Sequence, residues 1–280
     1  MKNYVFKVEE QFNNYSVLNF LKAIGLSQEI IKNVKFNGLF VNDIKVKNIN
    51  DLLTFGDQVK IVFNDVLNKF AHKEEGNLQV VYEDDYLLVV NKESGVLTHS
   101  SRYNNTPSLE GLVYNYSKNS PFTFRAINRL DKDTCGLVLI AKDEFIASLL
   151  NNELKQGKIE KRYIAKVKNK PIDSHFIVEK PIKRQSDSGI KRIIGDDGQY
   201  AKTEFYYLGE DGSGLHNLEA LLHTGRTHQI RVHLQSVNLP LYADSLYGEK
   251  VENKTYYLNA YKLTFTHPIL NKKMVLTAPM

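Results

Sequence analysis

The stretch RAINRLDKDTCGLVLIAK, residues 125–142, predicts where the fold and the chemistry of this chain meet. Two carboxylates, Asp131 and Asp133, closely follow Arg129, and the apolar run GLVLIA after them is typical of a buried strand. Charged groups at the mouth of a core strand are destabilising unless they are paired or perform a function. From these residues alone, Asp131 either closes a strand-entry turn with Arg129 or carries chemistry.

The composition describes a globular chain with a mild positive charge. Its 280 residues include 37 Lys and Arg against 32 Asp and Glu, a net charge of +5 that fits a nucleic-acid partner without requiring one. A single cysteine, Cys135, excludes an intrachain disulfide and a thiolate zinc site. No apolar run approaches the ~18 residues of a membrane span, and no signal peptide is recognisable, so we expect a cytoplasmic protein.

Residues 1–66 predict a small α/β domain. Ser16 and Ser27 are placed to cap two short helices, each with apolar residues at helical spacing. Turn dipeptides then separate short strands such as LFVN at 39–42. Residues 67–77 are polar and lack a period, which indicates a linker.

Residues 78–280 predict a second, strand-rich α+β domain with a few packed helices. Strict alternation in KIEKRYIAKVK, residues 158–168, places Tyr163 on the inner face of a strand and Arg162 on the other face. The basic, glycine-containing segment 183–202 predicts a long hairpin or loop. The segment HTGRTHQIRVHLQSVN that follows later reads as a glycine turn and a helix.

Two patterns suggest a metal, and both fail on spacing. DKDTCG, residues 131–136, begins like a calcium loop, but cysteine takes the third ligand position and Lys142 takes the place of the bidentate glutamate. His223, His228 and His233 are five residues apart, so they do not share a helix face. Neither a P-loop nor a dinucleotide fingerprint is present. The sequence therefore predicts no metal and no nucleotide cofactor.

Four blocks in order resemble the RluA-type pseudouridine synthases and cover essentially all of residues 78–280. Arg129-Leu130-Asp131 and the apolar strand after it are similar to the family's RLD motif. The other three blocks begin VVYEDDYLLVVNK, KRYIAKV and HTGRTHQIRVH. The resemblance implies the pseudouridine synthase fold, an α+β domain built on a mixed, mainly antiparallel sheet.

The N-terminal domain carries a second resemblance. The synthase blocks, in turn, depart from the usual RluA-type motifs at several positions. FNGLFVNDIKV and FGDQVKI resemble the small RNA-binding module of ribosomal small-subunit protein S-four. Within the synthase blocks, Asn128 stands where the family usually has His, Cys135 where it has Ser, and Ala243-Asp244 where it has Gly-Asp. None of these departures removes the aspartate, the tyrosine or the arginines that the family's reaction uses.

The resemblance implies RNA as the partner and a reaction that detaches uracil at N1 and reattaches it through C5, without a cofactor. It implies that Asp131 attacks either the anomeric carbon or C6 of uracil, and that Arg231 keeps Asp131 ionised. Tyr163 is expected to stack under the flipped base and to assist removal of the C5 proton. Arg129 is expected to fill the vacated stack or clamp a phosphate. The other expected contacts to the RNA backbone are Arg226, Lys158, Lys161, Arg162, Lys183, Arg184, Lys191 and Arg192.

Large-subunit ribosomal RNA is the expected target, because modules of the S-four type are commoner among ribosomal modifiers, and we expect a monomer. Two alternatives stay open: a tRNA pseudouridine synthase, and a non-catalytic RNA-binding protein that kept the fold. The presence of Asp131, Tyr163 and Arg231 together argues against the second alternative, since a binding protein does not need the set.

Overall fold

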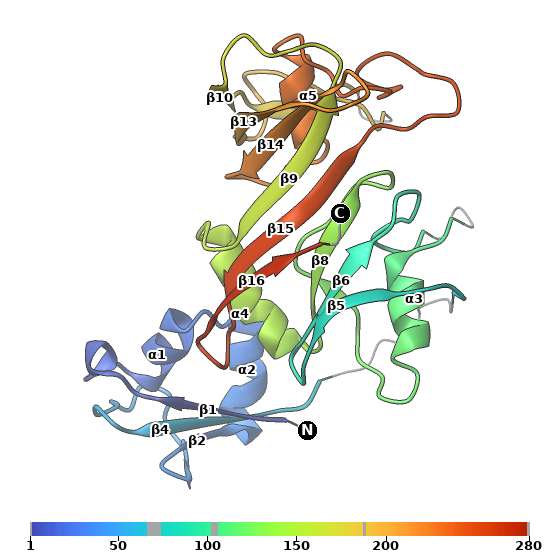
Figure 1. The fold of residues 1–280 in the computed structure, drawn as a ribbon. Coiled ribbons are helices and arrows are strands. Elements are labelled where there is room, and N and C mark those ends of the chain that lie inside the picture. Colours follow the sequence, from blue (N-terminus) through green and yellow to red (C-terminus); the bar gives the residue numbers. More distant parts are fainter. Residues whose placement is uncertain (1, 66–73, 102–105, 187–188, 279–280) are drawn as a thin grey trace.

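The computed structural model describes residues 2–65, 74–101, 106–186 and 189–278, and it contains two main sheets (Figure 1). One sheet has four strands and belongs to the N-terminal part of the chain. The other has ten strands and runs through the rest of the molecule. The predicted linker, 67–77, lies outside the described residues except for its last four.

The N-terminal sheet has the strand order β1-β4-β2-β3 and is covered by two helices. Ser16 and Ser27 cap these helices as predicted, because their hydroxyls accept the backbone N–H of Asn19 and Ile30. The sequence prediction missed β1, the first strand. The elements are β1 Lys2–Lys7, α1 Val17–Ala23, α2 Gln28–Asn37, β2 Leu39–Val41, β3 Ile44–Lys45 and β4 Gln58–Phe63, with a 3₁₀ turn at Glu10–Phe12.

The large sheet confirms the predicted α+β class. Its strand order is β10-β13-β14-β9-β15-β8-β6-β5, with β16 and β7 paired at its side, and β15 with β8 is the one parallel pair among the described strands. Two long strands, β9 and β15, join its upper and lower halves (Figure 1). The strands are β5 Gln79–Glu83, β6 Leu87–Lys92, β7 Arg125–Ala126, β8 Cys135–Ala141, β9 Glu160–Val167, β10 His175–Glu179, β13 Lys202–Glu210, β14 His216–Leu222, β15 Leu258–Thr266 and β16 Lys273–Thr277.

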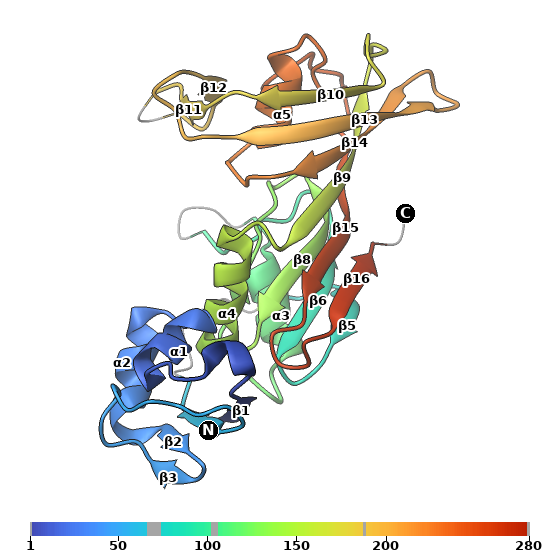
Figure 2. The same ribbon diagram turned by 90° about the vertical axis from the view of Figure 1, so that its left-hand side faces the viewer.

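Three helices and one hairpin complete this part of the chain. α3 Leu109–Tyr116, α4 Glu144–Lys155 and α5 Gln229–Gln235 pack on the sheet. β11 Ile182–Arg184 and β12 Arg192–Ile194 pair in the basic segment for which a hairpin or loop was predicted. Figure 2 shows α5 and this hairpin together at the end of the molecule far from β1. No described helix has the length and apolar character needed to cross a membrane.

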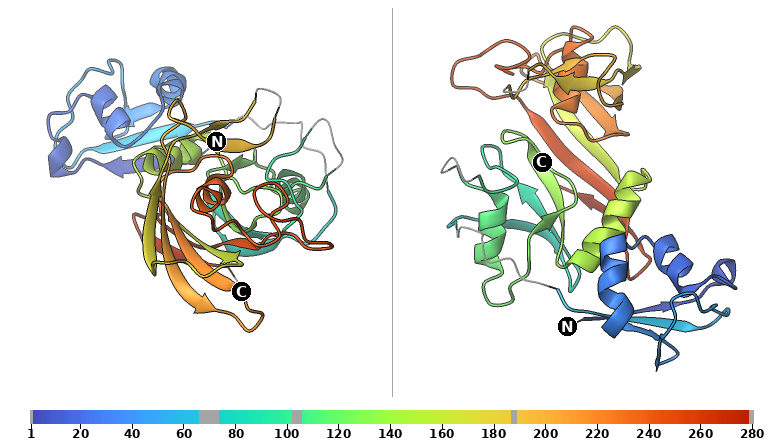
Figure 3. Two further views of the ribbon diagram at one scale, coloured as in Figure 1. Left: turned by 90° about the horizontal axis from the view of Figure 1, so that it is seen from above. Right: turned by 180° about the vertical axis from the view of Figure 1, so that it is seen from behind.

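The N-terminal sheet and helices pack directly against α4 (Figure 3). Tyr4 of β1 stacks on Phe145 of α4 with ring centroids 4.0 Å apart, and its hydroxyl donates a hydrogen bond to Asp143. Arg125 and Asp65 form a bidentate ion pair near the same contact. Buried side chains of α1, α2 and β4 lie in one apolar cluster with buried side chains of β8 and α4. The two sheets therefore share a core.

Candidate active site

Asp131 lies in a turn whose backbone is hydrogen-bonded by two buried side chains. The Lys92 ammonium, 1% exposed, donates to the backbone carbonyls of Glu93, Val96 and Lys132 at 2.7–2.9 Å. The Thr98 hydroxyl donates to the carbonyl of Leu130 and accepts from its N–H. Burial lowers the pKa of Lys92 to about 8. These bonds fix the backbone on both sides of Asp131.

The turn then enters β8 through a glycine that no other residue can replace without movement. Gly136 has φ +111°, and a Cβ at this position would lie 2.4 Å from the carbonyl oxygen of Ala260 in β15. The close approach lets β15 pair with the start of β8. Asp131 therefore emerges at a fixed point beside the long strands β9 and β15.

Arg231 of α5 reaches this carboxylate from the other side of the site. Its Nη1 lies 3.3 Å from Oδ2 of Asp131, while its Nε and Nη2 donate to the two oxygens of Asp244 at 2.7 and 2.9 Å. Asp244 is fully buried. Burial opposes the charge of Arg231, but the hydrogen bonds to Asp244 and the electrostatic interactions with Tyr256, Asp244 and Asp131 together outweigh it and raise the pKa of the guanidinium. Arg231 thus presents a permanent, oriented positive charge to Asp131.

His228 and two tyrosines surround the pair of Asp131 and Arg231. His228 begins α5 in the left-handed conformation, φ 59°, and its Nε2 lies 3.9 Å from Oδ2 of Asp131. Its Nδ1 is 2.7 Å from the hydroxyl of Tyr247. The rings of Tyr247 and Tyr256 flank the guanidinium of Arg231 at 4.8 and 4.5 Å. Burial lowers the pKa of His228, which favours the neutral imidazole near pH 7.

Tyr163 lies on the buried face of β9, as the alternation predicts, and is 5% exposed. Burial and the negative charge of Asp131 raise the pKa of its phenol well above the usual value. A phenol held in its protonated form is a poor base near neutral pH. The expected removal of the C5 proton would therefore require this phenol to lose its own proton first, and the two expected roles of Tyr163, stacking and proton removal, stay predictions.

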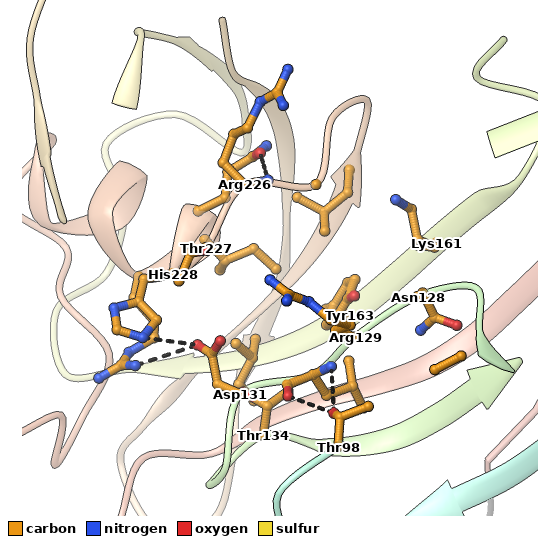
Figure 4. A pocket seen from close by; sticks show the side chains of 18 of the residues that line it. Thr98, Asn128, Arg129, Asp131, Thr134, Lys161, Tyr163, Arg226, Thr227 and His228 are labelled. Atoms are coloured by element: carbon orange, nitrogen blue, oxygen red, sulfur yellow. Dashed lines mark hydrogen bonds and ion pairs between the residues drawn. The ribbon is translucent and has the colours of Figure 1, made fainter. Parts of the chain in front are cut away.

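Asp131, Tyr163, His228 and Arg231 line a cavity of about 450 Å³, a volume within the usual size range of ligand pockets. Figure 4 shows Asp131 with its ion pairs at one side, Tyr163 in the middle and Lys161 beyond it. Arg129 and Arg226 line the cavity and are exposed at its surface. Among the residues that the structure describes, no group of three His, Cys, Asp or Glu side chains is arranged to hold a metal ion.

The structure does not bring the other predicted RNA contacts to this cavity. Arg162 lies on the opposite face of β9 and pairs with Glu160 and Glu219. Lys183 pairs with Asp197 at 2.6 Å in the basic hairpin. Lys158 and Arg184 lie outside the cavity as well. None of these four lines the cavity, whereas Lys191 and Arg192 at the start of β12 contact Tyr247, whose ring packs on Arg231.

The comparisons with known proteins agree with this geometry. A family model described as RNA pseudouridylate synthase matches residues 86–236. A Bacillus subtilis protein, the uncharacterized RNA pseudouridine synthase YjbO, is 32% identical over 271 residues, which cover 95% of each chain. The chain belongs to the RluA-type RNA pseudouridine synthases. It is therefore an isomerase that converts uridine in RNA to pseudouridine.

Two further relatives extend the comparison of this synthase. The ribosomal large subunit pseudouridine synthase C of Buchnera aphidicola is 30% identical over 90% of this chain and 84% of its own. The structure of human RNA pseudouridylate synthase domain containing 1 shares the fold with a TM-score of 0.62 and 24% identity, over 74% of this chain and 86% of that chain. The resemblance of residues 78–280 to the RluA-type synthases and the α+β fold expected from it are confirmed, whereas the resemblance of the N-terminal domain to the S-four module stays a prediction.

Sequence reasoning missed several groups of the synthase's site. Lys161 was assigned to the RNA backbone, but it is 8% exposed and lines the cavity on the same strand face as Tyr163. Lys161 is two residues from Tyr163 in β9, and the alternation of a strand already places both side chains on the same face. Lys92, His228 and Asp244 carried no signal of their own roles, because their partners come from distant parts of the chain.

Proposed function

We propose that this synthase modifies uridines of large-subunit ribosomal RNA, as a monomer, with the carboxylate of Asp131 as the attacking group. The observation that supports this role is the placement of Asp131 on the wall of the cavity, 3.3 Å from a buried arginine. The name of the Buchnera aphidicola relative supports ribosomal RNA as the substrate class.

The proposed reaction balances without any further reactant. The bond from C1′ of the ribose to N1 breaks, the base turns, and a bond from C1′ to C5 forms. The proton on C5 is lost and N1 gains one. Asp131 attacks either C1′ or C6 of the base, and in both routes it must be a carboxylate that has lost its hydration shell. The fixed guanidinium of Arg231 stabilises that anion, whose side chain is 25% exposed until the substrate covers it.

The remaining residues of the cavity position the nucleotide. A uridine must leave its stack to reach Asp131, because the reacting atoms are covered inside an RNA helix. Tyr163 offers a buried ring on which the extruded base can lie. Arg129 is exposed at the mouth of the cavity, and no hydrogen bond or ion pair is formed by its side chain with the described residues. It is therefore available to the RNA that surrounds the flipped nucleotide.

The test is a comparison of two strains and one variant. Pseudouridines are mapped in total RNA from a strain with the protein and a strain without it, and the deletion strain is complemented with wild type or Asp131→Asn. We expect a site in large-subunit ribosomal RNA to lose its pseudouridine in the deletion strain and in the variant. Purified Asp131→Asn should still bind RNA. Full modification by Asp131→Asn would refute the assignment of the carboxylate, and a site confined to tRNA would refute the substrate.

A further inference from the structure

Lys161 is a buried cation in the cavity, and the reaction described so far assigns it no role. It belongs to β9, whose burial pattern places Lys161, Tyr163, Ala165 and Val167 on one face. Its side chain is 8% exposed and lines the cavity. Two residues along a strand span about 6.6–6.8 Å, so Lys161 lies next to the ring of Tyr163, at a separation comparable to the size of a base.

The Lys161 ammonium has no partner within the described part of the chain. No carboxylate, carbonyl or hydroxyl there accepts a hydrogen bond from it, and burial alone lowers its pKa. Lys92 shows the contrast, because it is also buried but donates to three backbone carbonyls. A buried ammonium without an acceptor is strongly destabilising. Its acceptor is therefore expected to arrive with the substrate.

Lys161 lies at the end of the cavity away from Asp131. Figure 4 shows Tyr163 between the two side chains. The charge of Asp131 raises the pKa of Tyr163, whereas the pKa of Lys161 responds to burial alone. Gly225 lies over this end, since a Cβ there would lie 3.5 Å from Nζ of Lys161. A base stacked on Tyr163 with its glycosidic bond toward Asp131 would direct its opposite edge to Lys161.

We propose that the Lys161 ammonium donates a hydrogen bond to a carbonyl oxygen of the uracil on Tyr163 and holds the base while it turns. The inference rests on the proposed function of Asp131 and Tyr163. With N1 toward Asp131, the far side of uracil is C4 with its oxygen O4; after the base has turned, C5 takes the place of N1 and the far side is C2 with its oxygen O2. Whichever carbon Asp131 attacks, negative charge spreads onto these oxygens when the bond from C1′ to N1 breaks. A fixed donor at this place stabilises the charge as it develops.

The same contact explains how one residue serves both orientations of the base. Turning uracil about the axis through N3 and C6 exchanges N1 with C5 and O2 with O4. A lysine that meets one carbonyl before the turn therefore meets the other after it. Cytosine presents an amino group at C4, and an ammonium offers three donors and no acceptor. Lys161 thereby selects uracil over cytosine at this edge.

The test uses Lys161→Met, which keeps an unbranched chain and removes the charge. Its probe is total RNA from a strain that lacks the protein, a pool that contains the target whatever its identity. The rate of pseudouridine formation is measured at saturating enzyme, together with the Kd for RNA at two salt concentrations and the Tm. We expect the rate to fall by about 10²–10³-fold, the Kd to stay within about twofold of wild type, and the Tm to rise because an unpaired charge leaves the core.

Each contrary outcome overturns the inference in a recognisable way. A weaker Kd with a reduced salt dependence and an unchanged rate would mean that Lys161 contacts a phosphate. A lower Tm together with a lower rate would mean that Lys161 is structural. Lys168→Met is the matched control, because Lys168 follows the same strand but is 64% exposed and paired with Glu249, so its rate should equal that of wild type.

The pH dependence of the rate gives an independent readout. Because burial lowers the pKa of Lys161, the wild-type rate should fall as pH rises through that lowered value and the ammonium is lost. Lys161→Arg keeps its charge at every accessible pH, so its remaining activity should extend to higher pH. Lys92, whose pKa is about 8, titrates in both proteins, so the readout is the additional loss of activity in wild type. If wild type lost no more activity than Lys161→Arg at any alkaline pH, the inference would be overturned. Activity of Asp131→Asn would instead refute the proposed function, whatever Lys161→Met does.

Discussion

Asp244→Asn is the substitution that most directly tests how the site is held together. Oδ1 of Asp244 accepts Nη2 of Arg231 and the backbone N–H groups of Leu246 and Tyr247, and Oδ2 accepts Nε of Arg231. An asparagine keeps the first three bonds but turns its amide donors toward Nε, another donor. The substitution therefore leaves the turn intact and breaks the charge pair alone.

The expected loss of stability follows from the burial of both partners. The side chains of Asp244 and Arg231 are 0% and 8% exposed. Removing one partner of a buried ion pair costs about 3–5 kcal/mol. Asp131 remains 3.3 Å from Arg231 as a second carboxylate, so we expect the lower end, about 3 kcal/mol. The rate of isomerisation should fall as well, because the Arg231 guanidinium is no longer held in one orientation by Asp244 and no longer presents a fixed charge to Asp131.

Urea unfolding followed by far-UV circular dichroism measures this loss. Asp43→Asn is the matched control, because the carboxylate of Asp43 is 82% exposed and its pair with Lys60 should contribute less than about 1 kcal/mol. Adding Asp131→Asn leaves Arg231 without a carboxylate, so the double variant should lose about 1–2 kcal/mol more than the sum of the single losses. A loss below about 1 kcal/mol for Asp244→Asn, or strict additivity with Asp131→Asn, would refute the reasoning.

Three further predictions concern the support of the site and the docking of the N-terminal sheet. Lys92→Met leaves three buried carbonyls without their donor, so stability should fall by about 3 kcal/mol or more and the rate should fall with it, as urea unfolding and single-turnover assays can show. Ala243→Gly should raise stability by about 0.5–1 kcal/mol in the same unfolding assay, because Ala243 has φ 61°. Phe145→Ala removes the ring that stacks on Tyr4, so stability should fall by about 3–5 kcal/mol and hydrogen exchange should show residues 2–63 losing protection first.

The elements that the sequence predicted well are those with local causes. Ser16 and Ser27 cap helices through bonds to residues three positions on, and such bonds leave a short sequence signature. The alternation of β9 placed Tyr163 correctly for the same reason. β1 was missed because its partner, β4, begins about fifty residues later, and Val5 on its outer face is 56% exposed. A short strand of this kind is specified by its pairing more than by its own residues.

The departure at Ala243 indicates the local backbone conformation but not the tertiary contacts of the neighbouring residue. The sequence marked Ala243 as standing where the family usually has glycine. The structure gives the physical reason, because the backbone there is left-handed and glycine adopts that conformation without strain. The sequence held no sign that the next residue, Asp244, is the buried partner of Arg231. Position in a turn is local, whereas the identity of a partner depends on the tertiary fold.

The same distinction decides which of the basic residues are available to RNA. The sequence treated Arg162, Lys183 and Lys161 alike, as cations expected to face a phosphate backbone. The structure separates them by their partners, since Glu219 from β14 pairs with Arg162 and Asp197 from the turn after β12 pairs with Lys183. Within the described residues, no carboxylate pairs with Arg129 at the mouth of the cavity or with Lys161 inside it. A paired cation has already met its electrostatic requirement, so the cations left without carboxylates at the cavity are the ones whose charge the substrate must balance.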